Sequence, residues 1–139
     1  MLQTKKILAI DKEEIILKSI KKALKGDNFF DFIISTCGTA LDGLKLIRSD
    51  TFDLVFIDLV LPGMTGAELI RRIKNIYPNM PVIIMSGFSS VNSNIKRNSI
   101  YENLDAAGFL IKPFTTEELR SLVNKTIEKN KKIKDNNAK

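Results

Sequence analysis

The sequence predicts an α/β fold, in which helices cover both faces of a parallel β-sheet, and two observations support this. Five short apolar runs, rich in Ile and Val, recur along the chain with helix-like segments between them. The runs are nearly continuous, as in strands buried on both faces, rather than alternating as in half-exposed strands. Strict alternation of strand and helix implies right-handed crossovers and a three-layer, doubly wound (βα)5 arrangement. The predicted strands are Ile7–Ile10, Phe32–Ile34, Leu54–Ile57, Val82–Met85 and Phe109–Ile111.

The segments between these strands carry the signals of amphipathic helices. From Glu14 to Lys25, apolar residues recur on one face until a Gly-Asp-Asn turn ends the pattern. A second helix is predicted after Thr39, and the third and fifth begin at capping boxes, in which a threonine stands three residues before a glutamate. The two boxes are Thr65 with Glu68 and Thr115 with Glu118. The fourth segment, about residues 90–103, has only a weak apolar stripe among Ser and Asn.

Length and composition exclude several classes of protein. At 139 residues, 44% of them hydrophobic, the chain is long enough for one domain with its own core. It contains no histidine, which excludes histidine acid–base chemistry and histidine metal ligands, and its one cysteine, Cys37, excludes an intrachain disulfide and a cysteine zinc cluster. No apolar stretch reaches the roughly 20 residues of a transmembrane helix, and no signal-peptide pattern is present. We therefore expect a cytoplasmic protein.

The net charge of +6 is concentrated at the C-terminal end of the chain. From Arg120 to Lys139 there are seven basic residues and two acids, so the remaining 119 residues carry only +1. A basic tail can bind phosphates or anionic lipid, but a Lys-rich last helix is commonly a solvated end. We expect a domain of residues 1–130 and a basic, disordered tail of residues 131–139, with neither nucleic acid nor membrane as a partner.

Four polar residues stand where apolar runs end: Asp11, Asp58, Ser86 and Lys112. In a parallel sheet the carboxyl ends of the strands meet at one edge, where ligands bind at the point at which the strand order reverses. The flavodoxin-like order 2-1-3-4-5 makes the first and third strands neighbours, so these side chains should converge. No glycine lies between Asp11 and Glu14, which argues against a dinucleotide, Walker-type or mononucleotide site. The predicted site must therefore act through side chains.

These residue types suit phosphoryl transfer. Asp11, Glu13 and Asp58 are oxygen donors, and carboxylates held close together repel unless a cation such as Mg²⁺ lies between them. Lys112 and Ser86 could hold the oxygens of a transferring phosphoryl group, and Asp58 would be the nucleophile that forms an acyl phosphate. Each residue alone is more commonly a cap, a turn residue or a surface charge. The prediction rests on their joint placement.

Over about residues 5–130, the chain resembles a response-regulator receiver domain. The resemblance is carried by Ile7–Asp11, by Asp53–Asp58 with Leu61–Gly66, by Pro81–Gly87 and by Ala107–Phe114. It implies a signalling domain rather than an enzyme, one that assists its own phosphorylation and dephosphorylation. A sensor histidine kinase or phosphotransfer protein would phosphorylate Asp58.

The resemblance also implies roles for the other residues. Asp11, Asp58 and the backbone carbonyl of Val60 would bind Mg²⁺, while Ser86 and Lys112 would contact the phosphoryl oxygens. Ser86 and Phe109 would form the switch, and a downstream protein would bind the face made by the fourth helix, fifth strand and fifth helix. The peptide bond between Lys112 and Pro113 is typically cis in this family, as the low cost of cis before proline allows.

One position departs from the family pattern. The family opens its site with two adjacent acids, the second of which ligates the metal, and Lys12 holds that second position here. Glu13 could swing in and support a weaker site, or Lys12 could take the cation's place and pair with Asp11 and Asp58. A third alternative is that Lys12 points to solvent while Glu13 ligates the metal. We expect Mg²⁺ binding to be weakened rather than abolished.

Two functions follow from these observations. The first is a phosphorylation switch that changes partner binding. The alternative is a pseudo-receiver, a phosphorylation-independent interaction module that Lys12 has deprived of its metal. The span between Ser86 and Lys112 is longer than is typical, which indicates either a modified output face or a tolerated surface insertion. No output domain follows, so we expect either a stand-alone protein or a fragment of a longer regulator.

Overall fold

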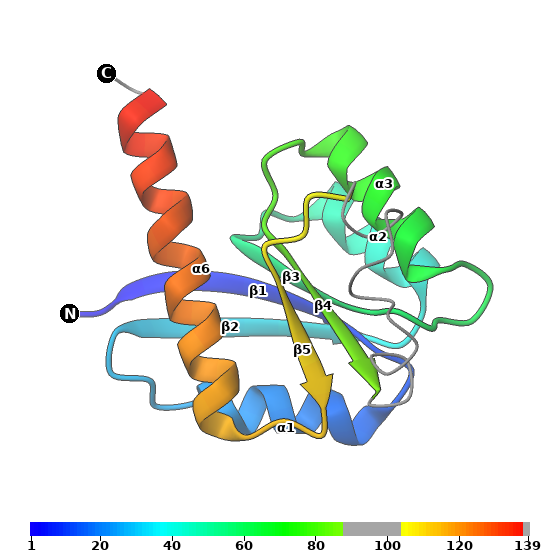
Figure 1. The fold of residues 1–139 in the computed structure, drawn as a ribbon, viewed down its shortest axis with the longest axis horizontal. Coiled ribbons are helices and arrows are strands. Elements are labelled where there is room, and N and C mark those ends of the chain that lie inside the picture. The colour runs from blue at the N-terminus through cyan, green and yellow to red at the C-terminus, as the bar shows by residue number, and fades with distance from the viewer. Residues whose placement is uncertain (88–103, 138–139) are drawn as a thin grey trace.

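Five parallel strands form a sheet in the order β2-β1-β3-β4-β5, as predicted (Figure 1). The computed structural model describes residues 1–87 and 104–137. Each strand extends at least one residue beyond its predicted apolar run, because ladder hydrogen bonds use the backbone and do not require apolar side chains. The strands are β1 (Gln3–Ile10), β2 (Phe30–Cys37), β3 (Leu54–Asp58), β4 (Val82–Gly87) and β5 (Gly108–Lys112).

Helices cover both faces of the sheet, which confirms the three-layer arrangement. The helices are α1 (Glu14–Leu24), α2 (Ala40–Ser49), α3 (Gly66–Ile76) and α6 (Thr116–Asn137). α1 and α6 pack on one face of the sheet, and α2 and α3 pack on the other (Figure 1). The hydroxyls of Thr39, Thr65 and Thr115 each accept a hydrogen bond of 3.1 Å from the backbone N–H three residues later, as N-caps do. The predicted fourth helix lies outside the described residues.

The central strands supply two apolar cores. On β1, Leu8 and Ile10 join the core beneath α2 and α3, while Ile7 and Ala9 join the core beneath α1 and α6. This confirms burial on both faces for β1's C-terminal half, and β3 is buried along its whole length. β2 differs from the prediction, since its Ile33 is 50% exposed. β2 is an edge strand with a neighbour on one side only, so less of its surface is covered.

The strand register brings the carboxyl ends of the central strands level with one another. Ile10 pairs with Ile57, Asp58 pairs with Met85, and Gly87 pairs with Lys112. The residues that end or follow β1, β3, β4 and β5 therefore meet at one edge of the sheet. This edge is where the sequence predicts the site.

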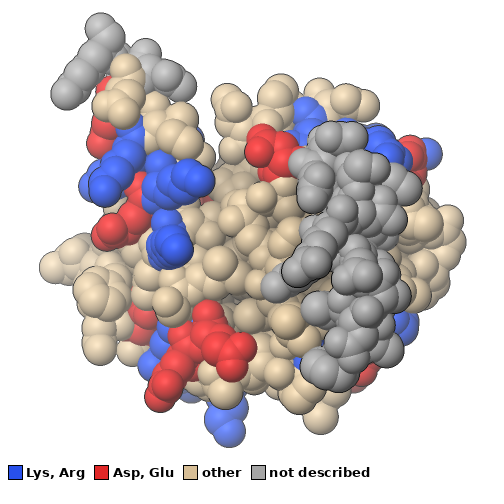
Figure 2. Space-filling view, viewed as in Figure 1, with Lys and Arg blue, Asp and Glu red and all other residues tan. Residues whose placement is uncertain are grey.

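The last helix, α6, is longer than predicted. A disordered tail was expected for residues 131–139, whereas α6 continues to Asn137. Residues 131–137 contain neither glycine nor proline, so nothing in the sequence stops the helix there. In the described part of the chain, Ile127 is the last buried apolar residue, and the rest of α6 projects past the sheet (Figure 1), with basic side chains gathered on it (Figure 2). None of the described helices, α6 included, is long and apolar enough to cross a lipid bilayer.

Candidate functional site

Asp58 is the last residue of β3 and is almost completely buried. Its Oδ1 accepts a hydrogen bond of 3.2 Å from the backbone N–H of Val60. The loop after β3 folds back tightly, since the Gly66 N–H donates to the Leu59 carbonyl at 3.1 Å. A carboxylate at a strand end is costly to desolvate without partners, and this loop gives Asp58 one of its hydrogen bonds.

Asp11 follows β1 and is fully buried. Its Oδ1 accepts a hydrogen bond of 2.8 Å from the backbone N–H of Glu13. Its Oδ2 lies 2.8 Å from the Lys112 Nζ as an ion pair, and Lys112 is its only charged partner among the described residues. Burial raises the pKa of Asp11, Lys112 opposes that shift, and the nearby charge of Asp58 adds to it.

Lys112 ends β5, and its ammonium lies among three carboxylates. Its Nζ is 2.8 Å from Asp11, 3.4 Å from Glu13 and 3.5 Å from Asp58. Burial by itself would lower the pKa of Lys112, but these three acids outweigh burial and raise it. The peptide bond between Lys112 and Pro113 is cis, as the resemblance implied. Lys112 is thus a permanent cation that links the ends of β1, β3 and β5.

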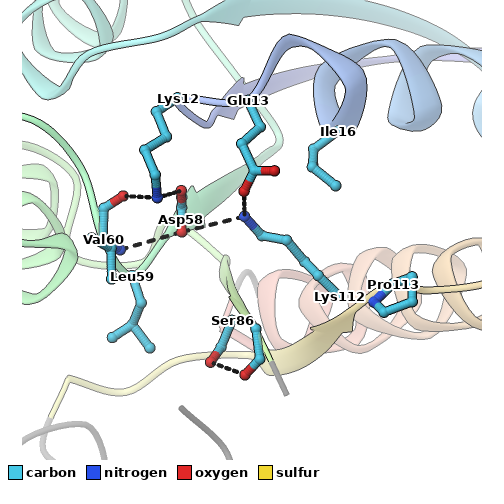
Figure 3. A pocket seen from close by; sticks show the side chains of 10 residues that line it. Lys12, Glu13, Ile16, Asp58, Leu59, Val60, Ser86, Lys112 and Pro113 are labelled. Carbon is cyan, nitrogen blue, oxygen red and sulfur yellow. Dashed lines mark hydrogen bonds and ion pairs between the residues drawn. The ribbon is translucent and has the colours of Figure 1, made fainter. Parts of the chain in front are cut away.

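Ser86 lies at the end of β4, nearly buried, and stands apart from the charged residues. Its hydroxyl donates to the carbonyl of the next residue, Gly87, at 3.2 Å (Figure 3). A pocket of about 430 Å³ opens at this edge, and its lining includes Asp58, Ser86 and Lys112. Phe109, the other predicted switch residue, is partly buried against the core beneath α2 and α3.

Lys12 reaches from the end of β1 across to β3. Its Nζ lies 3.3 Å from the Asp58 Oδ2 and donates to the Val60 carbonyl at 3.0 Å (Figure 3). The alternative in which Lys12 points to solvent is therefore wrong. The expected contact with Asp58 is present, but Asp11 pairs with Lys112 and not with Lys12. Glu13 turns its half-exposed carboxylate toward Lys112.

The oxygen donors suit Mg²⁺ by their chemistry, but they already face cations. Asp11, Asp58 and the Val60 carbonyl are the hard oxygen ligands that Mg²⁺ prefers. The Lys12 ammonium contacts two of these three donors, and Lys112 contacts the third. Within residues 1–87 and 104–137, no three acidic, histidine or cysteine side chains are grouped so that they could hold a metal.

Comparison with known proteins identifies the family. Residues 7–124 match the family described as the response regulator receiver domain. The chain belongs to that family. Among solved structures, the receiver domain protein from Clostridium thermocellum is 30% identical, with a TM-score of 0.79 over 93% of this chain and 98% of that one. A CheY-like receiver domain protein from Methanospirillum hungatei JF-1 is 26% identical, with a TM-score of 0.79 over 95% and 98% of the two chains.

The curated relatives are longer than this receiver domain. The regulatory protein LuxO of Vibrio cholerae is 32% identical over 105 residues, which are 76% of this chain and 22% of LuxO. The DNA-binding transcriptional regulator NtrC of Escherichia coli is 32% identical over 124 residues, which are 87% of this chain and 24% of NtrC. The chain therefore spans about a quarter or less of the length of these relatives.

Gly66 was quoted from the sequence only as part of a motif, and its structural role beside Asp58 was not predicted. A Cβ on Gly66 would lie 2.8 Å from the Asp58 carbonyl oxygen and 2.9 Å from the Leu59 Cα. Only glycine lets α3 begin this close to the end of β3. The available signal was a glycine directly after the N-cap Thr65, because glycine is otherwise unfavourable within a helix.

Proposed function

We propose that this receiver domain accepts a phosphoryl group on Asp58 and thereby switches its binding of a downstream protein. The observation that carries the proposal is the placement of Asp58 at the pocket, with its Oδ1 3.5 Å from the Lys112 ammonium. The donor would be a sensor histidine kinase or a phosphotransfer protein, and the reaction would take place in the cytoplasm. The phosphoacceptor is a signalling residue, so the domain is not classed as an enzyme.

The proposed step is a displacement at phosphorus. A carboxylate oxygen of Asp58 supplies the electron pair for the new O–P bond, and the P–N bond to the donor's imidazole breaks, with its electron pair passing to nitrogen. Lys112 would neutralise charge on the phosphoryl oxygens, and the Ser86 hydroxyl would turn from the Gly87 carbonyl and donate to one of them. Positioning and charge neutralisation would provide most of the rate.

Mg²⁺ is the proposed cofactor, bound weakly. Asp11, Asp58 and the Val60 carbonyl would hold it, with Glu13 as a further candidate, and when bound it would neutralise charge on the phosphoryl oxygens. The support for this set is its chemistry, since two buried carboxylates and a backbone carbonyl are hard oxygen ligands and the buried Asp11 Oδ2 has only the Lys112 ammonium as a partner among the described residues. The support for weak binding is Lys12, which meets two of the three donors.

Ser86 and Phe109 are the proposed switch. Movement of the Ser86 hydroxyl toward the phosphoryl group would open space for Phe109 to pack inward, since Phe109 on β5 is only partly buried. β5, α6 and the region of the predicted fourth helix would form the face that the downstream protein binds. Such a switch shifts a two-state equilibrium through contacts that exist only in the phosphorylated state.

A second function is favoured by one observation, the ion pair between Lys12 and Asp58. If the ion pair between Lys12 and Asp58 persists in the presence of phosphodonors, Asp58 would stay unphosphorylated and the domain would bind its partner without phosphorylation. The function would then depend on the surface that binds the partner and not on phosphorylation of Asp58.

The two functions separate in one experiment. The protein is incubated with acetyl phosphate across a Mg²⁺ titration, and its intact mass is measured for the wild type and for Asp58→Asn. A phosphoryl adduct on the wild type alone supports the phosphoacceptor. Absence of an adduct at tens of millimolar Mg²⁺, with Asp58→Asn leaving partner binding unchanged, supports the phosphorylation-independent module.

A further inference from the structure

Lys12 contacts two oxygen atoms of the site, one on Asp58 at the end of β3 and one on Val60, two residues later. Its Nζ donates to the Val60 carbonyl at 3.0 Å and lies 3.3 Å from the Asp58 Oδ2. Both oxygens belong to the donor set proposed for the divalent cation. Mg²⁺ held by these two oxygens would therefore compete with the Lys12 ammonium for them.

The charges at this edge already balance closely without a metal. Asp11, Glu13 and Asp58 contribute three negative charges, and Lys12 and Lys112 contribute two positive ones. A divalent cation added beside both ammonium groups would leave the cluster with a net positive charge. Like charges at such separations repel, so binding of the metal favours departure of one lysine.

Lys12 is the lysine that can leave. Its side chain is 41% exposed, whereas the Lys112 side chain is 10% exposed and is surrounded by three acids. A long lysine side chain at the protein surface can move its charged end into water at little cost. The pocket beside Asp58 is lined by Lys12 on one side and by Ser86 on another, so Lys12 does not fill it.

We propose that Lys12 is a tethered occupant of the divalent-cation position, and that Mg²⁺ binds this receiver domain only by displacing it. Lys12 then does more than fail to supply a ligand: it competes for the Asp58 carboxylate and the Val60 carbonyl. The proposal rests on the proposed function for the identity of the metal-binding atoms. The site would exchange between a Lys12-bound form and a metal-bound form.

The test separates a competitor from a missing ligand. Mg²⁺ affinity is measured by titration calorimetry at constant ionic strength, and NMR shifts of the Val60 amide report whether the metal binds at this edge. Lys12→Met removes the charge but adds no ligand, and Lys12→Asp removes the charge and adds one. Lys22→Met and Lys22→Asp are the matched controls, because Lys22 is exposed on α1 and each control makes the same change in net charge as the corresponding Lys12 variant.

Competition predicts that Lys12→Met tightens Mg²⁺ binding by about tenfold or more, the scale of a cation–cation repulsion in a high-dielectric setting. Lys12→Asp should bind tighter still, and both Lys22 variants should stay within about twofold of the wild type. An unchanged or undetectable affinity in Lys12→Met would overturn the proposal, even if Lys12→Asp binds tightly. An equal gain in the corresponding Lys22 variant would overturn it too. Failure of the proposed function would give a different result. Lys12→Asp would then form no phosphoryl adduct, while the Mg²⁺ affinities of the Lys12 and Lys22 variants would still follow the expected order.

Discussion

Replacing Lys112 with methionine tests whether this lysine holds the acidic cluster together. Lys112→Met keeps the length of the side chain and removes its charge. Asp11 is fully buried and would then lose the only ammonium that contacts it among the described residues. A buried charge left without its counterion is strongly destabilising, because neither water nor a partner compensates for its desolvation.

The expected magnitude follows from the contacts that remain. Breaking a buried ion pair costs about 3–5 kcal/mol, against a total stability of about 5–15 kcal/mol. Asp11 keeps its hydrogen bond from the Glu13 N–H, and Asp58 keeps Lys12, so we expect the lower end, about 3 kcal/mol at pH 7.5. The loss should shrink as the pH falls. Burial raises the pKa of Asp11, and without Lys112 it rises further, so protonation of Asp11 relieves the penalty at acid pH.

The assay is urea denaturation of the wild type and of Lys112→Met at pH 7.5 and pH 5. Lys22→Met is the control, because that exposed lysine on α1 should change stability by no more than about 0.5 kcal/mol. In the wild type the raised pKa of Lys112 contributes stability that is fully present at both pH values and is lost only above pH 10.5. A loss below about 1 kcal/mol at pH 7.5, or a loss that grows toward pH 5, would refute the reasoning.

Three further outcomes are expected. Gly66→Ala should lose about 1–3 kcal/mol of stability in urea denaturation, since the new Cβ would meet the Asp58 backbone. Gly87→Ala, whose Cβ would meet no atom of the described residues within 4 Å, should stay within about 0.5 kcal/mol, and equal effects of the two changes would contradict this. Burial raises the pKa of the Cys37 thiol from 9.0 to about 11. Alkylation of Cys37 by iodoacetamide, measured by mass spectrometry, should therefore be about a hundredfold slower at pH 8 than alkylation of an ordinary thiol, because the thiolate is the nucleophile. An alkylation rate that levels off below pH 9 would disprove the raised pKa. Thr65→Ala should cost about 1 kcal/mol in the same denaturation assay, because it removes the N-cap of α3, and no loss would show that the cap is dispensable.

Much of the fold and the location of the site could be predicted because both depend on simple periodicity. Continuous apolar runs indicate buried parallel strands, and parallel strands bring their carboxyl ends to one edge. The polar residues at the strand ends therefore lie at the same edge, whatever their detailed contacts. They are Asp11, Asp58, Ser86 and Lys112. The length of α6 could not be predicted in this way, since a Lys-rich segment with neither glycine nor proline suits both a projecting helix and a frayed tail.

Which lysine pairs with which acid could not be predicted from the sequence, for a physical reason. Two lysines and three acids at one edge can pair in several ways, and the choice depends on side-chain reach. Lys112, at the end of β5, contacts Asp11 although β3 and β4 lie between β5 and β1, while Lys12 crosses to Asp58 and the Val60 carbonyl. Pairing of Lys12 with both Asp11 and Asp58 was one of the alternatives that the sequence left open, and in the structure Lys12 contacts only Asp58 of the two.

The most direct test of the account is to locate the phosphoryl group. The protein is phosphorylated with acetyl phosphate at high Mg²⁺ and reduced with borohydride, which converts an aspartyl phosphate to homoserine, and the peptides are then mapped by mass spectrometry. We expect homoserine at position 58 of the wild type, and none at any position in Asp58→Asn. Homoserine at another aspartate, or none in either the wild type or Lys12→Asp, would contradict it.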